Sequence, residues 1–148
     1  MITPNEEKLG QLVNEAFSGE SGVFRPCAWY EERLDCIRVL VRDCGILESR
    51  ISDRLTVLED AYYEEDGGKR FVGFTFKGAK HFCKQQGWNL ATPIKLADFV
   101  DAILKGFPGP LVEWFVDKVA KPILEEEPIE QIEIPDRGYS PGLEPGLA

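Results

Sequence analysis

The sequence predicts a single α+β domain, in which an antiparallel meander of three or four strands packs against about four helices and an extended acidic tail follows. Three observations predict it. Apolar residues recur with period two between residues 35 and 59, and with helical spacing near both ends of the domain. Of the 148 residues, 43% are hydrophobic and 29% are charged, which is typical of a globular protein. Prolines and acidic residues gather at the C-terminal end.

The first predicted helix spans about residues 3–17. Thr3 is a candidate N-cap, and Pro4 suits the first helical position. The apolar residues that follow share one helical face: Leu9, Leu12, Val13, Ala16 and Phe17. Gly19 then ends the helix. A loop and a short turn or helix are expected over residues 20–34.

The strands of the predicted meander lie between residues 35 and 76. Ile37, Val39 and Val41 alternate with their neighbours and indicate the first strand. Residues 46–51 and 54–59 give two more. The Glu-Glu-Asp-Gly-Gly turn at 64–68 predicts a hairpin that leads into an aromatic strand at 71–76. Helical spacing of Leu34, Ile37, Val41 and Cys44 leaves an alternative, in which residues 29–60 form two helices before a β-hairpin at 62–76.

Three helices are predicted in the last third of the domain. The first begins at Lys77–Gly78 and closes near Gly87. The second spans 92–105, with Thr92 as N-cap and a proline at the first helical position. The third runs from Pro110 to about 121, where Pro122 ends or kinks it. The corner between the last two is short, so they are expected to form an antiparallel pair.

The domain is predicted to span residues 1–124, and residues 125–148 are predicted to be an acidic tail rich in proline and glycine. The tail has seven acidic residues against Arg137 alone, so it carries −6 of the net charge of −9. Truncation after Glu125 is expected to leave thermal stability nearly unchanged. The isoleucines at 129, 132 and 134 lie between acidic residues, and an extended segment of this kind can add to a sheet edge or lie in a groove.

No motif in the sequence establishes a function. It has no phosphate-binding P-loop, no dinucleotide fingerprint and no serine-hydrolase or zinc-protease signature. The favoured hypothesis is therefore a non-enzymatic protein-interaction or regulatory module without a cofactor. Its expected partner is another protein or a second copy of itself, in a homodimer. The candidate interface residues are aromatic: Trp29, Tyr30, Trp88 and Trp114.

A local resemblance supports a second hypothesis. Residues 72–82 run from an aromatic strand through Lys77-Gly78 into a basic amphipathic helix, and this passage resembles the step from the wing into the final helix of winged-helix domains. The resemblance implies a DNA-binding regulator with a recognition helix within 46–60. Its basic surface would consist of Lys69, Arg70, Lys77, Lys80 and Lys84. Acidic residues interleaved with the arginines, and the net charge of −9, make nucleic acid the less favoured partner.

A third hypothesis is a small enzyme or a thiol or metal site around His81 and Cys83. The cysteines at 27, 36, 44 and 83 have none of the short paired spacings of zinc sites, so reduced, metal-free thiols are expected. The first residues lack the basic and apolar regions of a secretory signal, and no apolar run reaches the roughly 18 residues of a membrane span. A cytoplasmic protein that does not contact membranes is the expectation.

Overall fold

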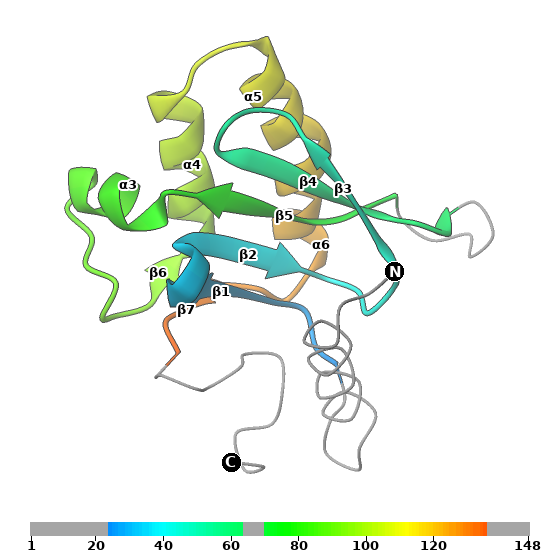
Figure 1. Ribbon diagram of the computed structural model, residues 1–148, viewed down its shortest axis with the longest axis horizontal. Coiled ribbons are helices and arrows are strands. Elements are labelled where there is room, and N and C mark those ends of the chain that lie inside the picture. The colour runs from blue at the N-terminus through cyan, green and yellow to red at the C-terminus, as the bar shows by residue number, and fades with distance from the viewer. Residues whose placement is uncertain (1–23, 64–69, 136–148) are drawn as a thin grey trace.

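A computed structural model describes residues 24–63 and 70–135. They form a mixed α+β fold, in which a seven-stranded sheet of order β3-β4-β5-β2-β1-β7-β6 carries helices on one face (Figure 1). The strands are β1 (Cys27–Glu31), β2 (Cys36–Leu40), β3 (Ile46–Arg50), β4 (Leu55–Asp60), β5 (Phe71–Lys77), β6 (Ile94–Lys95) and β7 (Gln131–Glu133). The helical segments are η1 (Glu32–Leu34), α3 (Ala79–Gln85), α4 (Leu96–Gly106), α5 (Pro110–Phe115), η2 (Val116–Ala120) and α6 (Lys121–Glu126).

The strand interpretation of residues 35–59 is confirmed, and the two-helix alternative is wrong. β2, β3 and β4 lie where the period-two pattern predicts strands. The hairpin between β4 and β5 is also confirmed, because Leu55 pairs with Phe76 in an antiparallel register. Its loop at 64–68 lies outside the described residues.

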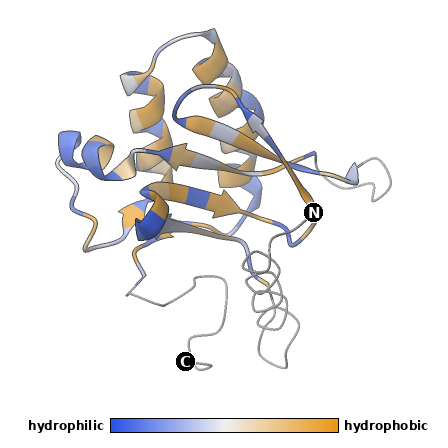
Figure 2. Cartoon of the chain, in the orientation of Figure 1, coloured by the Kyte–Doolittle hydropathy of each residue, from blue (hydrophilic) through white to orange (hydrophobic). Residues whose placement is uncertain are grey.

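The core lies between the sheet and the helices. Two cross-strand rows point toward the helices: Tyr30, Ile37, Phe76 and Leu55 in one, and Ala28, Val39, Phe74 and Val57 in the other. In Figure 2 the hydrophobic colour is concentrated on the central strands and on the helices that cover them. Phe74 packs edge-on against Phe115 at 4.8 Å between ring centroids, and Phe76 packs against Phe99 at 5.3 Å. Each such pair adds about 0.5–1.5 kcal/mol beyond area burial.

The predicted meander of three or four strands is wrong in detail, because the sheet has seven strands. β1 forms where a turn or helix is expected, and β6 and β7 are only two and three residues long. β7 runs parallel to β1 and antiparallel to β6, so that Ile132 pairs with both Ala28 and Ile94. Strands this short are held by neighbours that are distant in sequence, which a local pattern does not reveal.

Residues 125–135, which the sequence assigns to the extended tail, pack into the domain. α6 continues to Glu126, Ile129 is buried and Ile132 is fully buried. Of the two possibilities for the isoleucine-bearing segment, a sheet strand or a groove, the structure shows the first: it forms β7, between β1 and β6. Residues 136–148 lie outside the described part of the chain.

The described residues form three helices rather than about four, and the helix expected at 3–17 falls outside them. α5, η2 and α6 are one continuous helix. It passes Pro122 through a π-turn, in which Lys121 donates to the carbonyl of Val116. The widened turn accommodates the proline, whose ring would otherwise clash with a carbonyl one turn earlier. α4 starts at Leu96 instead of Thr92 because Ile94 and Lys95 are taken into β6.

Asp35, at the start of β2, caps α3. Its main-chain carbonyl accepts hydrogen bonds from the N–H groups of Gly78 at 2.9 Å and Ala79 at 3.2 Å. Its side-chain Oδ1 accepts from the N–H of Lys80 at 2.9 Å. These are the donors that a helix leaves unpaired at its N-terminus. The cap fixes α3 against the sheet.

Candidate protein-interaction surface

The four aromatic residues predicted to form one interface do not lie together. Tyr30 is buried in the core, and Trp29 is half-buried on the opposite face of the sheet. Trp88 is half-buried in the loop after α3 and packs against the core. Trp114 differs from them, because it lies on α5 with 39% of its surface exposed. The structure thus leaves Trp114 as the one member with an open aromatic surface.

Trp114 belongs to a small apolar surface on the outer side of α5. Leu111, three residues earlier on the helix, is 58% exposed. Residues three apart on a helix are neighbours on its surface. The Trp114 ring meets the ring of Phe71 on β5 at 5.5 Å between centroids and an angle of 87°. We call Phe71, Leu111 and Trp114 the α5 surface.

Arg70 holds the Phe71 side of the α5 surface in place. Its guanidinium carbon lies 5.2 Å from the centroid of the Phe71 ring and 5.7 Å from that of Tyr63. Its Nε also donates to Glu59 at 3.1 Å. A cation over an aromatic face contributes about 0.5–1 kcal/mol at an exposed site. The rings are therefore ordered by contacts with their neighbours as well as by the backbone.

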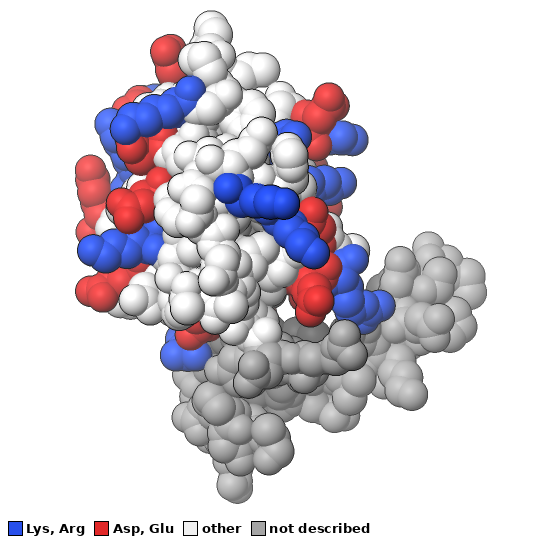
Figure 3. Space-filling view, turned by 90° about the vertical axis from the view of Figure 1, so that its left-hand side faces the viewer, with Lys and Arg blue, Asp and Glu red and all other residues white. Residues whose placement is uncertain are grey.

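The basic residues of the second hypothesis are spread over different elements. Arg70 is engaged by Glu59, Lys77 ends β5, and Lys80 and Lys84 lie exposed on α3. Lys69 lies outside the described residues. Figure 3 shows acidic and basic side chains interleaved on the face that it displays.

Residues 46–60 form β3 and β4, so the recognition helix that the winged-helix resemblance requires is not formed there. The reason is the antiparallel pairing of β4 with β5, which places Leu55 and Val57 in the core. The local resemblance at 72–82 lies in a different fold. The strand and helix expected within that run are confirmed as β5 and α3.

His81 and Cys83 point in different directions on α3. His81 is exposed, whereas Cys83 is fully buried beneath the helix. Burial raises the pKa of the Cys83 thiol to about 11, with a smaller contribution from the charge of Asp35. A nucleophilic cysteine needs a lowered pKa and an exposed sulfur. Within residues 24–63 and 70–135, no three histidine, cysteine, aspartate or glutamate side chains are grouped as a metal site.

Two shallow hollows on the surface of the described residues are candidates for a ligand site. One, of about 370 Å³, lies between residues 25–28 and 128–133 and includes the ion pair of Arg25 with Glu133 at 3.5 Å. Cys27 borders it, but burial raises the pKa of that thiol to about 11. The other, of about 380 Å³, lies between residues 87–89 and 92–98 and includes Trp88. Carboxylates line both hollows, Glu130 and Glu133 in the first and Asp98 in the second, but neither hollow contains a histidine.

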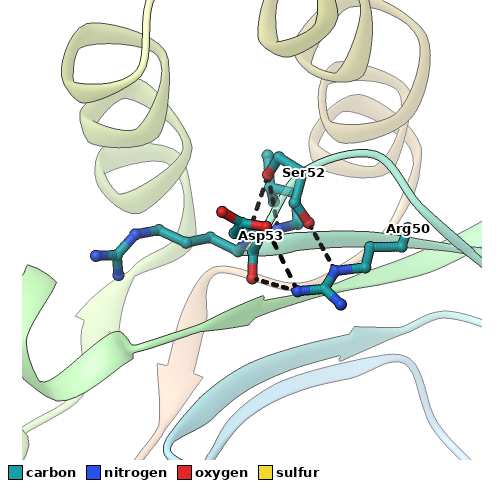
Figure 4. Close-up of polar contacts among 5 residues, drawn as sticks. Arg50, Ser52 and Asp53 are labelled. Carbon is teal, nitrogen blue, oxygen red and sulfur yellow. Dashed lines mark hydrogen bonds and ion pairs between the residues drawn. The ribbon is translucent and has the colours of Figure 1, made fainter.

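Sequence reasoning missed a free sheet edge at β3. In the described part of the chain β3 pairs with β4 alone, and its residues are mostly exposed. The turn after it is well ordered: the Ser52 hydroxyl oxygen accepts from the N–H groups of Arg54 at 3.2 Å and Leu55 at 3.0 Å. Figure 4 shows the Arg50 side chain bent back over this turn toward Ser52 and Asp53. The sequence pattern at residues 46–51 correctly predicts a strand, but only the order of the strands shows that it lies at the edge of the sheet.

Comparison of the chain with models of protein families, with curated proteins and with solved structures finds no match. No helix within residues 24–63 and 70–135 is long and apolar enough to cross a membrane. The geometry of the described residues is therefore what supports a functional proposal.

Proposed function

We propose that the protein is a non-enzymatic protein-interaction module and that a partner protein docks on the α5 surface. The observation that carries this proposal is the exposure of Trp114 and Leu111 side by side, 39% and 58%, on a helix whose inner residues Val112 and Phe115 are buried. Exposed tryptophans in ordered apolar surroundings are frequent energetic centres of protein interfaces. Isolated exposed apolar residues, such as Leu34 on η1, are ordinary.

The order of the α5 surface supports binding. Phe71 lies between Arg70 on one side and the Trp114 ring on another. Side chains that are already fixed lose little rotational freedom on association, which lowers the entropic cost of binding. The charges nearby are mixed, with an ion pair of Lys118 and Asp117 at 3.6 Å. Apolar side chains of another protein are therefore the expected contacts, rather than a highly charged ligand.

The state of the thiols is consistent with a non-enzymatic role. The pKa values of Cys27 and Cys83 are raised to about 11, mainly by burial. Both thiols therefore stay protonated at neutral pH. A protonated, buried thiol is neither an effective nucleophile nor a ready metal ligand.

The test is site-specific photo-crosslinking in the native cell. A photoreactive phenylalanine derivative replaces Leu111 in one strain and Leu34 in a matched control strain. We expect a discrete protein adduct from position 111 that is absent from position 34. Adding Trp114→Ser to the first strain should reduce the adduct at least tenfold, while Leu34→Ser should leave it unchanged.

Circular dichroism and thermal unfolding check that Trp114→Ser stays folded. A second variant, Leu111→Glu, is combined with the photoreactive group at position 114. It should disturb folding less, because Leu111 is largely exposed. Equal labelling from positions 111 and 34 would contradict the proposal. So would an adduct that is insensitive to both Trp114→Ser and Leu111→Glu.

A further inference from the structure

Among residues 24–63 and 70–135, no strand pairs with the main-chain groups on the outer edge of β3. Ile51 donates its N–H to Leu55 at 3.0 Å, and Gly45 accepts from Ala61 at 2.8 Å, so odd-numbered residues from 45 to 51 bond toward β4. In an antiparallel pair the residues between them direct their N–H and C=O groups to the other side. The groups of Ile46, Glu48 and Arg50 therefore point away from the sheet.

This edge is the longer of the two that the sheet presents. β3 has five residues, whereas β6 at the opposite edge has two. β3 contains no proline, and the irregularity in this part of the sheet lies between β4 and β5. Proline, bulges, very short strands and charged side chains are the usual means of preventing edge-to-edge pairing. β3 has none of the first three, and its two charges, Glu48 and Arg50, have opposite sign and so can attract each other across an edge.

We propose that β3 pairs antiparallel with β3 of a second copy of the chain, about a twofold axis at Ser49. The outward groups can bond only when even-numbered residues face even-numbered residues. Centring the pair on Ser49 places Glu48 directly opposite Arg50 of the second copy, twice by symmetry. Shifting the register by two residues places either Glu48 opposite Glu48 or Arg50 opposite Arg50, and like charges directly opposite are destabilising. Charge complementarity thus selects one register.

The other face of β3 fits the same register. Leu47 lies opposite Ile51 of the second copy, and Ser49 lies opposite Ser49. Leu47 is 56% exposed, and no strand of the described residues lies across the edge from it, while Ile51 packs partly against the core. Pairing two apolar residues across strands contributes about 0.2–1 kcal/mol relative to alanine. One register therefore satisfies both faces of the strand.

Arg50 is oriented by its own turn. Its Nε donates to the carbonyl of Ser52 at 3.2 Å, and its Nη2 donates to the carbonyl of Asp53 at 3.4 Å (Figure 4). The ion pair with the Asp53 carboxylate is longer, 3.7 Å, and exposed. A guanidinium has five N–H donors, so groups remain for a second carboxylate. Glu48 has no hydrogen-bond or ion-pair partner within the described part of the chain.

The dimer is expected to be weak. Two five-residue strands form about four main-chain hydrogen bonds in this register. They bury less than the roughly 1,200 Å² of a standard stable interface. We therefore expect a dissociation constant between about 10 µM and 1 mM, with monomer and dimer in rapid exchange.

Sedimentation equilibrium of the full chain from about 5 µM to 1 mM tests the pairing through charge reversal. Wild type should show a monomer–dimer equilibrium. Glu48→Arg alone and Arg50→Glu alone should each weaken self-association at least tenfold, because each brings like charges together. An equimolar mixture of the two variants should form a heterodimer, and the double variant Glu48→Arg/Arg50→Glu should regain wild-type association.

Disulfide formation gives a second, independent measurement. Ser49→Cys places two thiols opposite each other at the twofold axis, at a non-hydrogen-bonded position where side chains are closest. It should yield a covalent dimer on mild oxidation. Leu47→Cys is the matched control on the same face, and it should not, because its neighbour is Ile51. Circular dichroism checks that each variant is folded.

The dimer proposal stands apart from the proposed α5 surface. Leu111→Glu should abolish crosslinking to the partner protein without changing self-association in sedimentation. Glu48→Arg should weaken self-association without changing that crosslinking. A wild-type chain that stays monomeric up to about 1 mM would overturn the dimer. Self-association that is unaffected by either single charge reversal would also overturn it. Equal crosslinking of Ser49→Cys and Leu47→Cys would contradict the register.

Discussion

The hydroxyl of Tyr30 donates a 2.9 Å hydrogen bond to Oδ1 of Asp35, the same oxygen that accepts from the N–H of Lys80. One carboxylate thus joins β1, the start of β2 and the first turn of α3. Asp35 also has a left-handed backbone, with a φ of 46°. Aspartate and asparagine tolerate that conformation better than most residues. Aspartate therefore suits position 35 both because it tolerates this backbone conformation and because its carboxylate accepts these hydrogen bonds.

Asp35→Ala should lower the free energy of unfolding by about 1–3 kcal/mol, because it removes the helix cap and leaves the buried hydroxyl of Tyr30 without an acceptor. Asp35→Asn should cost less, since it keeps an oxygen acceptor and tolerates the backbone. Urea denaturation measures both. A cycle with Tyr30→Phe should show coupling, and strictly additive losses would argue against a shared hydrogen bond.

Alkaline pH should destabilise the fold. Burial raises the pKa values of Cys27 and Cys83 from 9.0 to about 11, and burial together with Asp35 also raises the pKa of Tyr30. Raised values mean that the folded chain favours the neutral forms. Their stabilising contribution is therefore fully present below about pH 9 and is lost as pH rises toward 11. Urea denaturation between pH 7 and 11 measures it, and a flat profile would contradict it.

The same burial predicts an order of thiol reactivity. Cys44 is half-buried, whereas Cys27, Cys36 and Cys83 are buried. Under native conditions at pH 8, iodoacetamide should therefore modify Cys44 first, and the other three only when the protein opens. Peptide mass spectrometry identifies the modified positions. Modification of Cys83 as fast as Cys44 would show that α3 does not protect its inner face.

Ile132→Ala should lower the free energy of unfolding by about 2–5 kcal/mol, because the side chain is fully buried between β1 and β6. This replaces the expectation that residues after Glu125 are dispensable. Gln131→Ala, on the exposed side of the same strand, is the control and should change it by less than about 0.5 kcal/mol. Equal, small effects would mean that β7 contributes nothing to the fold.

Gly73 should not tolerate alanine. A Cβ at Gly73 would lie 2.0 Å from the carbonyl oxygen of Val39, so β5 would have to separate from β2. We expect a loss of about 1–3 kcal/mol or more, as for overpacked sites. Gly106→Ala, at the end of α4, meets only a Phe82 ring carbon at 3.4 Å and should be neutral or stabilising. Thermal unfolding of the two variants distinguishes them.

The sequence predicts the parts of this fold that local patterns determine. Alternation over 37–41 and 54–59 predicts strands because one face of each is buried. Pro110 predicts the start of α5 because a proline fits the first helical turn. β6 and β7 escape prediction because they are stabilised by each other and by β1, through pairings that short-range patterns do not contain.

The candidate surfaces depend even more on tertiary structure. An aromatic residue looks the same in sequence whether the fold buries it, as for Tyr30, or leaves it exposed, as for Trp114. The edge position of β3 follows from β5, which pairs with both β2 and β4 and so moves β3 to the end of the sheet. Five residues separate β2 from β3, yet two strands lie between them. Of the features that define the β3 edge, the sequence alone shows only the opposite charges of Glu48 and Arg50.

Because β7 pairs in parallel with β1, the sheet cannot be completed until the ribosome has synthesised residues 131–133. β6 pairs only with β7 among the described strands, and β1 has β7 as its second neighbour. About a hundred residues separate β1 from β7, which corresponds to roughly 5–20 s of translation. During that interval the main-chain edge of β1 stays open, and β6 has no partner strand once it is synthesised. We therefore expect chains released at residue 126 to aggregate or to remain bound to chaperones, whereas chains released after residue 135 should fold.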